Sequence, residues 1–167
     1  MISIKKINNE VFFLKEKNGF INEKHINFLK KKVNFTKRKR ARICLHKNLK
    51  DRLHEMLIIL SKDGYIRPHK HLNKVESLHV IEGSADVIFF NNRGKIIKKK
   101  TIGSYGKGLD FFYRLDSSIY HTFNIKSKYF IFHESTEGPL IKSKTSYATW
   151  SPPEDNLIEA KNFIRSL

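Results

Sequence analysis

The chain has 167 residues, of which 33 are Lys or Arg and 16 are Asp or Glu, so its formal net charge at pH 7 is +17. This length gives one domain with a substantial core, and a hydrophobic content of 40% excludes a disordered chain. The one cysteine, Cys44, excludes an intramolecular disulfide. The positive charge suggests a polyanionic partner or a phosphate-bearing substrate, but basic residues spread over most of the chain also fit a compositional bias that only decorates the surface.

The first twenty residues are charged and lack the apolar core of about 7–15 residues that a signal peptide needs. No stretch reaches the roughly eighteen apolar residues of a membrane-spanning helix. We therefore expect a cytoplasmic protein without a membrane span.

Residues 1–40 are expected to form an N-terminal extension with one amphipathic helix. Asn22 is a suitable N-cap, and apolar residues follow it at helical spacing, which predicts a helix over about residues 23–34. The dense basic run at residues 37–40 lacks the interleaved aromatic side chains on which nucleic-acid bases stack. We interpret this run as a solvated junction between the helix and the first strand.

After residue 40, short apolar runs alternate with turn sequences such as Asp63-Gly64 and Glu82-Gly83, which predicts an all-β core. About eight strands of this kind form an antiparallel sandwich or barrel. The predicted strands cover residues 42–46, 53–60, 78–81, 85–90, 95–102, 111–115, 122–125 and 129–133. The expected organisation is thus a barrel over residues 41–152, followed by a C-terminal helix over residues 153–167.

The most informative feature is a His69-x-His71-x4-Glu76 pattern framed by glycines and followed later by His121. Residues two apart on a strand point to the same face, so His69 and His71 can both present an imidazole to one ion. A short turn brings Glu76 back beside them on the next strand. His121 then has to come from a distant strand across the barrel.

Three imidazoles and one carboxylate predict a site for one divalent transition metal ion, namely zinc, iron, manganese, nickel or copper. Open coordination positions allow such an ion to polarise a substrate oxygen or to activate water or dioxygen. The alternative is that His69 and His71 are an ordinary half-exposed strand pair, but the added Glu76 and the glycine frame favour the metal site. His79 has the opposite strand parity to Glu76 and should face away from the ion.

The segment from Gly64 to Gly83 resembles the first motif of the cupin superfamily, one residue shorter before the first histidine. The second motif is matched only at His121. The expected proline, glycine and asparagine of that motif are replaced by Asp116, Ser118 and Ile125.

More narrowly, the chain is similar to the WbuC family of cupin-fold metalloproteins, which are often found with bacterial O-antigen polysaccharide genes. The resemblance extends over roughly residues 40–152 and is carried by residues 40–46, 53–56, 65–71, 79–83, 112–115, 133–139 and 150–152. It implies a cupin double-stranded β-helix, or jelly-roll barrel, with short N-terminal and C-terminal helices. It also implies a homodimer and a metal site at His69, His71, Glu76 and His121, but it gives no reaction.

Five further residues are candidates for the pocket. His54 can be a proton-transfer group or a satisfied core histidine, and Tyr113 can donate a proton. Arg114 follows Tyr113 directly, so strand alternation allows only one of the two to point inward. If a strand begins at Ala41, Arg42 can point inward and meet an anionic ligand, and Arg67 can reach the cavity mouth. A guanidinium there binds carboxylate or phosphate through two parallel hydrogen bonds. The alternative for these pocket candidates is a surface or packing role.

Three functions are compatible with this site. The first is a metal-dependent enzyme for a phosphate-bearing sugar or nucleotide sugar in surface-polysaccharide assembly, with isomerisation or epimerisation as the expected chemistry. The second is an iron-dependent oxygenase, because histidines and a carboxylate also suit ferrous iron. The third is a non-enzymatic sugar-binding or regulatory module in which the ion orients a ligand or braces the barrel. Nucleic acid is not the expected partner.

Overall fold

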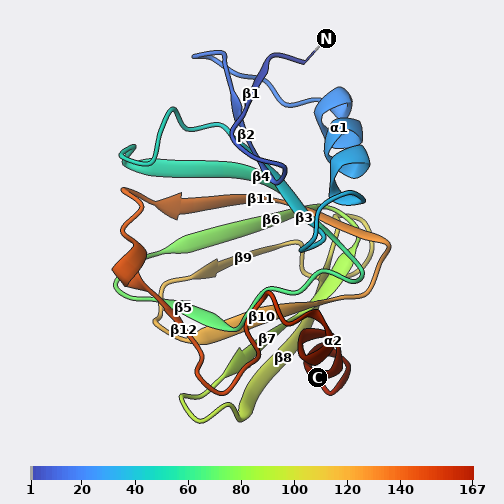
Figure 1. Cartoon of the computed structure of the whole chain (residues 1–167), viewed down its shortest axis with the longest axis vertical. Coiled ribbons are helices and arrows are strands. Elements are labelled where there is room, and N and C mark those ends of the chain that lie inside the picture. The colour runs from blue at the N-terminus through green and yellow to red at the C-terminus, as the bar shows by residue number, and fades with distance from the viewer. Residues whose placement is uncertain (1) are drawn as a thin grey trace.

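Two facing sheets form the body of the protein in the computed structural model, which describes residues 2–167. The larger sheet contains, in spatial order, β1 (Ile4–Lys6), β2 (Val11–Leu14), β3 (Arg40–Cys44), β4 (Leu53–Ser61), β11 (Tyr129–Glu137), β6 (Glu76–Glu82) and β9 (Phe112–Leu115). The smaller sheet contains β12 (Thr145–Tyr147), β5 (His69–His71), β10 (Tyr120–Ile125), β7 (Ser84–Phe90) and β8 (Ile96–Gly103). Figure 1 shows the larger sheet above the smaller one. This arrangement confirms the all-β, cupin-type jelly-roll barrel expected from the sequence.

Alternation along the strands sorts side chains between the barrel interior and the outside. On β6, Leu78 is buried whereas its neighbour His79 is exposed, so His79 faces away from the interior as expected. Three phenylalanine rings, Phe123, Phe130 and Phe132, pack together inside the barrel with centroids 5.1–5.7 Å apart. They fill one end of the interior and leave the other end to polar residues.

The predicted N-terminal helix is present as α1 (Glu23–Val33), which lies against the outer face of the larger sheet. Asn22 caps it by accepting a hydrogen bond from the backbone (3.0 Å), and the Asn22 backbone N–H donates to His25 Nδ1 (3.2 Å). Both ends of this capping box satisfy N–H groups that the first turn of a helix leaves without partners. Leu29 and Val33 are fully buried against the sheet.

The first residues of the chain form β1 and β2, two short strands that the sequence pattern did not predict. They extend the larger sheet at its edge, and β2 pairs with β3 in parallel register. Phe12 is buried beneath α1, with its ring 5.0 Å from that of Phe28 in an edge-to-face arrangement. The N-terminal segment therefore shares a core with the barrel's larger sheet.

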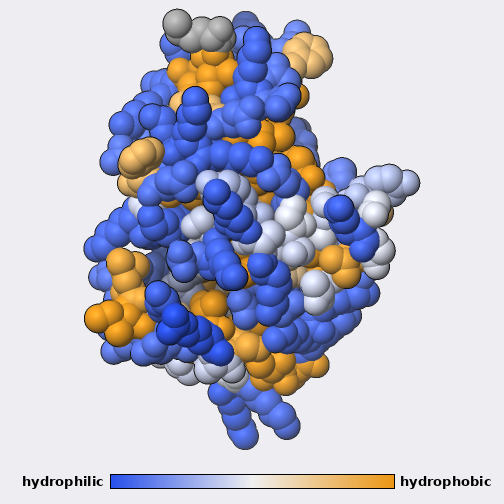
Figure 2. Space-filling model, turned by 90° about the vertical axis from the view of Figure 1, so that its right-hand side faces the viewer, coloured by the Kyte–Doolittle hydropathy of each residue, from blue (hydrophilic) through white to orange (hydrophobic). Residues whose placement is uncertain are grey.

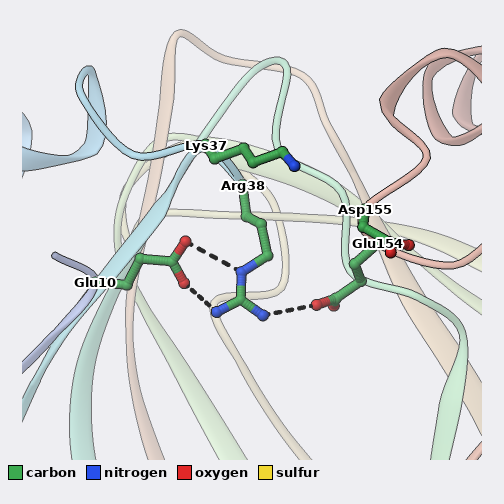
Figure 3. Close-up of a pocket in the computed structure, with 5 residues that line it drawn as sticks. All are labelled: Glu10, Lys37, Arg38, Glu154 and Asp155. Atoms are coloured by element: carbon green, nitrogen blue, oxygen red, sulfur yellow. Dashed lines mark hydrogen bonds and ion pairs between the residues drawn. The ribbon is translucent and has the colours of Figure 1, made fainter. Parts of the chain in front are cut away.

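The basic run lies between α1 and β3, as expected, but it is only partly a solvated junction. Lys37 is exposed, whereas Arg38 forms ion pairs with Glu10 near the N-terminus and with Glu154 near the C-terminus (Figure 3). Arg40 also pairs with Glu154, at 2.8 Å. These partners lie far away in sequence, which is why the sequence pattern could not indicate them.

The C-terminal helix is α2 (Leu157–Arg165), capped by Asn156. Its Phe163 ring lies 6.2 Å from Tyr65 and 6.3 Å from Trp150, and these contacts hold the helix against the barrel. Figure 2 views the side of the molecule on which α1 and α2 lie, and shows a mostly hydrophilic surface with separate hydrophobic patches. Within residues 2–167, none of the helices has the length and apolar character needed to cross a membrane.

Candidate metal centre

Three histidines converge on one point of the smaller sheet. His69 and His71 lie on β5, and His121 on the neighbouring strand β10 is directly opposite His69 in the antiparallel register. Each imidazole offers a nitrogen, and these nitrogens all lie within 4.8 Å of one another. Two atoms that bind the same ion at about 2.0–2.1 Å can be little more than 4 Å apart, so only small adjustments separate this arrangement from a three-histidine site.

Glu76 approaches the histidines from the opposite sheet. Its Oε1 atom lies 3.0 Å from Nε2 of His121, and its Oε2 atom lies 3.3 Å from Nε2 of His71. We expected His121 to come from across the barrel and Glu76 to lie beside the β5 histidines. The structure reverses these positions, because β10 pairs with β5 whereas β6 belongs to the larger sheet. The carboxylate is therefore the group that connects the two sheets at this site.

The outer ring nitrogens are held by protein oxygen atoms. Nδ1 of His69 lies 3.0 Å from the carbonyl oxygen of Arg67, and Nδ1 of His121 lies 3.1 Å from the carbonyl oxygen of Ile119. A carbonyl oxygen only accepts hydrogen bonds, so Nδ1 carries the proton in both rings. For His121 this directs Nε2 toward Glu76, the arrangement in which a second group fixes the orientation and tautomer of a metal-binding histidine. Nδ1 of His71 contacts the Thr145 hydroxyl at 3.2 Å.

The electrostatics of the group suit a cation. Burial, helped by His121 and His71, lowers the pKa of His69 to about 3, so this imidazole is neutral and able to bind a metal. Burial alone would raise the pKa of Glu76, but the hydrogen bonds to His121 and His71 outweigh it and hold that pKa below its usual range. Burial alone would lower the pKa of His121, but Glu76 reverses the effect and raises it.

These shifts describe a buried carboxylate that needs positive charge beside it. A proton on His121 can supply that charge, and so can a divalent ion bound to the Nε2 atoms and to Glu76. Imidazole nitrogens and a carboxylate oxygen are ligands that zinc, iron, manganese and nickel accept. The residues therefore fit the metal that the sequence pattern predicts.

The glycines that frame the motif have backbone explanations of their own. Gly83 adopts φ +84°, and a Cβ there would lie 2.0 Å from the carbonyl oxygen of Tyr129. A Cβ at Gly64 would lie 2.9 Å from the carbonyl oxygen of Ser61. These two glycines are therefore explained by tight turns of the backbone and are not themselves an indication of metal binding.

Glu134 on β11 is a further acidic residue beside the centre, and the sequence interpretation missed it. Its register partner on β6 is Leu78, two residues after Glu76, so Glu134 and Glu76 face the same side of the sheet. Burial and then the charge of Glu76 raise the pKa of Glu134 to about 7. Strand alternation could have indicated this position, because Phe130, Phe132 and Glu134 are spaced two residues apart on β11 and therefore face the same side.

The structure decides between Tyr113 and Arg114. Tyr113 is the register partner of Leu78 and packs against the interior cluster, and burial together with Glu76 and Glu134 raises its pKa well above the usual value. Arg114 is exposed, and its nearest carboxylate is that of Asp116 at 4.0 Å. Tyr113 therefore belongs to the interior and Arg114 to the surface.

The other predicted pocket residues take different positions. His54 is buried, and its ring stacks on that of His46 with centroids 4.1 Å apart. It lies in the same cross-strand row as Thr136 and Glu76, and its Nε2 atom has no hydrogen-bond partner within residues 2–167.

The two predicted anion-binding arginines, Arg42 and Arg67, lie in different surroundings. Arg42 is exposed on β3. Its positive charge opposes the rise in the pKa of Glu134 but does not cancel it. Arg67 donates hydrogen bonds to the carbonyl oxygen of Ala148 (2.7 Å) and to the Ser151 hydroxyl (3.3 Å), and thereby fastens the C-terminal segment.

Comparison with known proteins gives a family model and several structures of similar fold. The model of a domain of unknown function, DUF6016, matches residues 21–102, which include His69, His71 and Glu76. No curated protein matches the sequence.

The similar structures include the capsular polysaccharide assembling protein CapF from Staphylococcus aureus, with 15% identity, a TM-score of 0.53, and coverage of 68% of this chain and 33% of that one. The recombinant pro-11S globulin of pumpkin has 14% identity, a TM-score of 0.52, and coverage of 68% and 29%. A Shewanella oneidensis protein has 7% identity, a TM-score of 0.51, and coverage of 71% and 73%. The chain thus spans a third or less of the first two proteins, and identities this low establish a shared fold alone.

Proposed function

We propose that this protein is a metal-dependent enzyme acting on a small polar substrate, of the sugar or nucleotide-sugar isomerase or epimerase type, in the assembly of a bacterial surface polysaccharide. The observation that carries the proposal is the convergence of three imidazoles and Glu76 from two sheets, with Glu134 and Tyr113 facing the same interior. The resemblance to the WbuC family and the fold shared with CapF, a capsular polysaccharide assembling protein, support the substrate class.

A bound divalent ion would supply positive charge for an oxyanion that develops on the substrate. The chain's own residues supply the proton transfers. Glu134, with a pKa near neutrality, can take a proton from a substrate carbon and return it, since a general base works best when its pKa lies near the working pH. Tyr113 keeps its proton and can donate a hydrogen bond. His54 is a second proton-carrying group in this proposal, and Arg42 is the group that would meet a substrate phosphate.

Solvent deuterium exchange tests this proposal. Isomerases and epimerases of this type remove a proton from a carbon beside a carbonyl, so a turnover in D₂O leaves deuterium in the recovered sugar. The metal-loaded protein is incubated with a panel of UDP- and dTDP-linked keto sugars, which carry the carbonyl that this proton removal needs, and each is analysed by mass spectrometry. We expect deuterium in at least one sugar with the unaltered chain and none with His71→Ala. The matched control is His79→Ala, because His79 lies on the outer face of β6.

The same experiment distinguishes the other two functions. An oxygenase would consume dissolved oxygen with the iron-loaded protein and would leave no deuterium in an unconverted sugar. A binding module would retain a sugar on the metal-loaded protein without exchange. Either result, obtained with a protein shown to hold metal, would contradict the isomerase or epimerase proposal.

A further inference from the structure

A cavity with a volume of about 480 Å³ lies between α2 and the barrel. Its walls are residues 37–39, the turn at residues 62–65, the end of β10 at Asn124 and Ile125, and one face of α2. None of the proposed metal ligands lines it. Its size falls within the range of about 300–1,000 Å³ that is typical of small-molecule sites.

One side of this cavity is apolar because α2 does not close completely onto the barrel. Phe163 packs against Tyr65 and Trp150 and does not line the cavity, whereas Leu157, Ala160 and Ile164 line it. Ala160 is only 2% exposed, but Leu157 remains 46% exposed. An apolar helix face beside a cavity is a place where an apolar ligand group gains by leaving water.

The rim of the cavity is strongly basic. The lining side chains include six cations, Lys37, Arg38, Lys39, Lys62, Lys161 and Arg165, and two carboxylates, Asp63 and Glu154. Arg38 and Glu154 neutralise each other (Figure 3), and Lys39 donates to the carbonyl oxygen of Asn34 at 2.8 Å.

The remaining four cations, Lys37, Lys62, Lys161 and Arg165, form no ion pair within residues 2–167. Asp63, also without an ion pair there, offsets one of them. The cavity thus presents an excess of positive charge around an apolar wall.

We propose that this cavity binds a small organic anion, in which an aromatic or aliphatic group carries a phosphate, sulfonate or carboxylate. An inorganic anion would leave the apolar wall of Leu157 and Ile164 in water. A neutral ligand would leave the rim cations without partners. The volume excludes a folded macromolecule from the cavity itself.

Fluorescence titration with 8-anilinonaphthalene-1-sulfonate, an aromatic sulfonate, tests the proposal. We expect saturable binding to the unaltered chain and competition by AMP, and about tenfold weaker binding to the double variant Lys161→Gln and Arg165→Gln. The matched control is Lys98→Gln with Lys107→Gln, which removes the same charge from exposed residues outside the cavity. Equal affinity for both double variants would overturn the proposal.

Two further measurements separate the cavity from simpler explanations. Leu157→Gln should weaken binding of the aromatic probe, and thermal unfolding of each variant shows whether it still folds. If pyrophosphate displaces the probe as well as AMP does, the site recognises only charge and the proposal of an organic anion fails. Because His71→Ala leaves this cavity intact, binding to that variant should be unchanged. Failure here is therefore distinguishable from failure of the proposed metal-dependent function.

Discussion

Glu76 and its two histidine partners determine the chemistry of the site at the scale of single residues. The carboxylate contacts His71 and His121 through different oxygen atoms, in a place where burial would otherwise favour its neutral form. A charge kept in such surroundings has to be matched by a proton or a metal ion. The spacing of the motif predicted these ligand types, but not the sheet from which each one comes.

Glu134 shows why part of the site could not be predicted. Its proposed role as a base depends on a pKa raised by burial and by Glu76, and both effects depend on the pairing of β11 with β6. Strand parity places Glu134 on the inward face, but a single sequence does not show that β6 is the neighbouring strand.

Replacing Glu134 by glutamine should reduce the rate of deuterium exchange by about 10²–10⁴-fold, the usual contribution of a general base. Metal content should not change, because Glu134 is not one of the proposed ligands. The measurement is exchange rate together with elemental analysis of the same sample. Glu55→Gln, on the outward face of β4, is the control and should exchange normally. An exchange rate for Glu134→Gln equal to that of the control would rule out this role.

Cys44 should be unreactive in the folded protein. It is 2% exposed, and burial raises the pKa of its thiol to about 11. The nucleophilic thiolate is therefore scarce at every pH well below 11. A thiol-specific chromogenic reagent at pH 8 should label the chain in strong denaturant and leave the native chain unlabelled for many minutes. Rapid labelling of the native chain would contradict the buried position of Cys44 at the end of β3.

At the scale of elements, the sequence predicted best those segments whose signals are local. The capped helix α1 and the long strands carried clear periodicity and turn residues. By contrast, β1 and β2 are only three and four residues long and gain their stability from pairing at the sheet edge and from packing under α1. The sequence also could not predict that His121 lies beside His69. Strand alternation shows which face of a sheet a residue occupies, but it does not show which strand pairs with which.

The cap of α1 provides a test at this scale. Asn22→Ala should lower the free energy of unfolding by about 1 kcal/mol, because it removes the side-chain acceptor of the capping box. Urea unfolding followed by circular dichroism measures the change. Asn27→Ala, at an exposed position inside the same helix, should be neutral or slightly stabilising because alanine is the better helix former. Equal losses in both variants would mean that the cap contributes nothing.

At the scale of the whole molecule, two sheets and two helices place two candidate sites in one small chain. The net charge of +17 is not concentrated in one motif, and part of it is used in ion pairs such as those of Arg38 with Glu10 and Glu154. Four cations without an ion pair within residues 2–167 line the cavity beside α2, so this hollow combines positive charge with an apolar wall. The candidate metal centre lies elsewhere, where Glu76 on the larger sheet contacts His71 and His121 on the smaller one.

We propose that the three histidines and Glu76, where the two sheets meet, bind a divalent metal ion. The direct measurement is elemental analysis of the purified chain after equilibration with zinc, iron(II), manganese or nickel and removal of free metal. We predict one bound ion per chain, lost in the double variant His69→Ala with His121→Ala and retained in His79→Ala. A chain that retains none of these metals, or a double variant that retains as much as the unaltered chain, would contradict metal binding at this site.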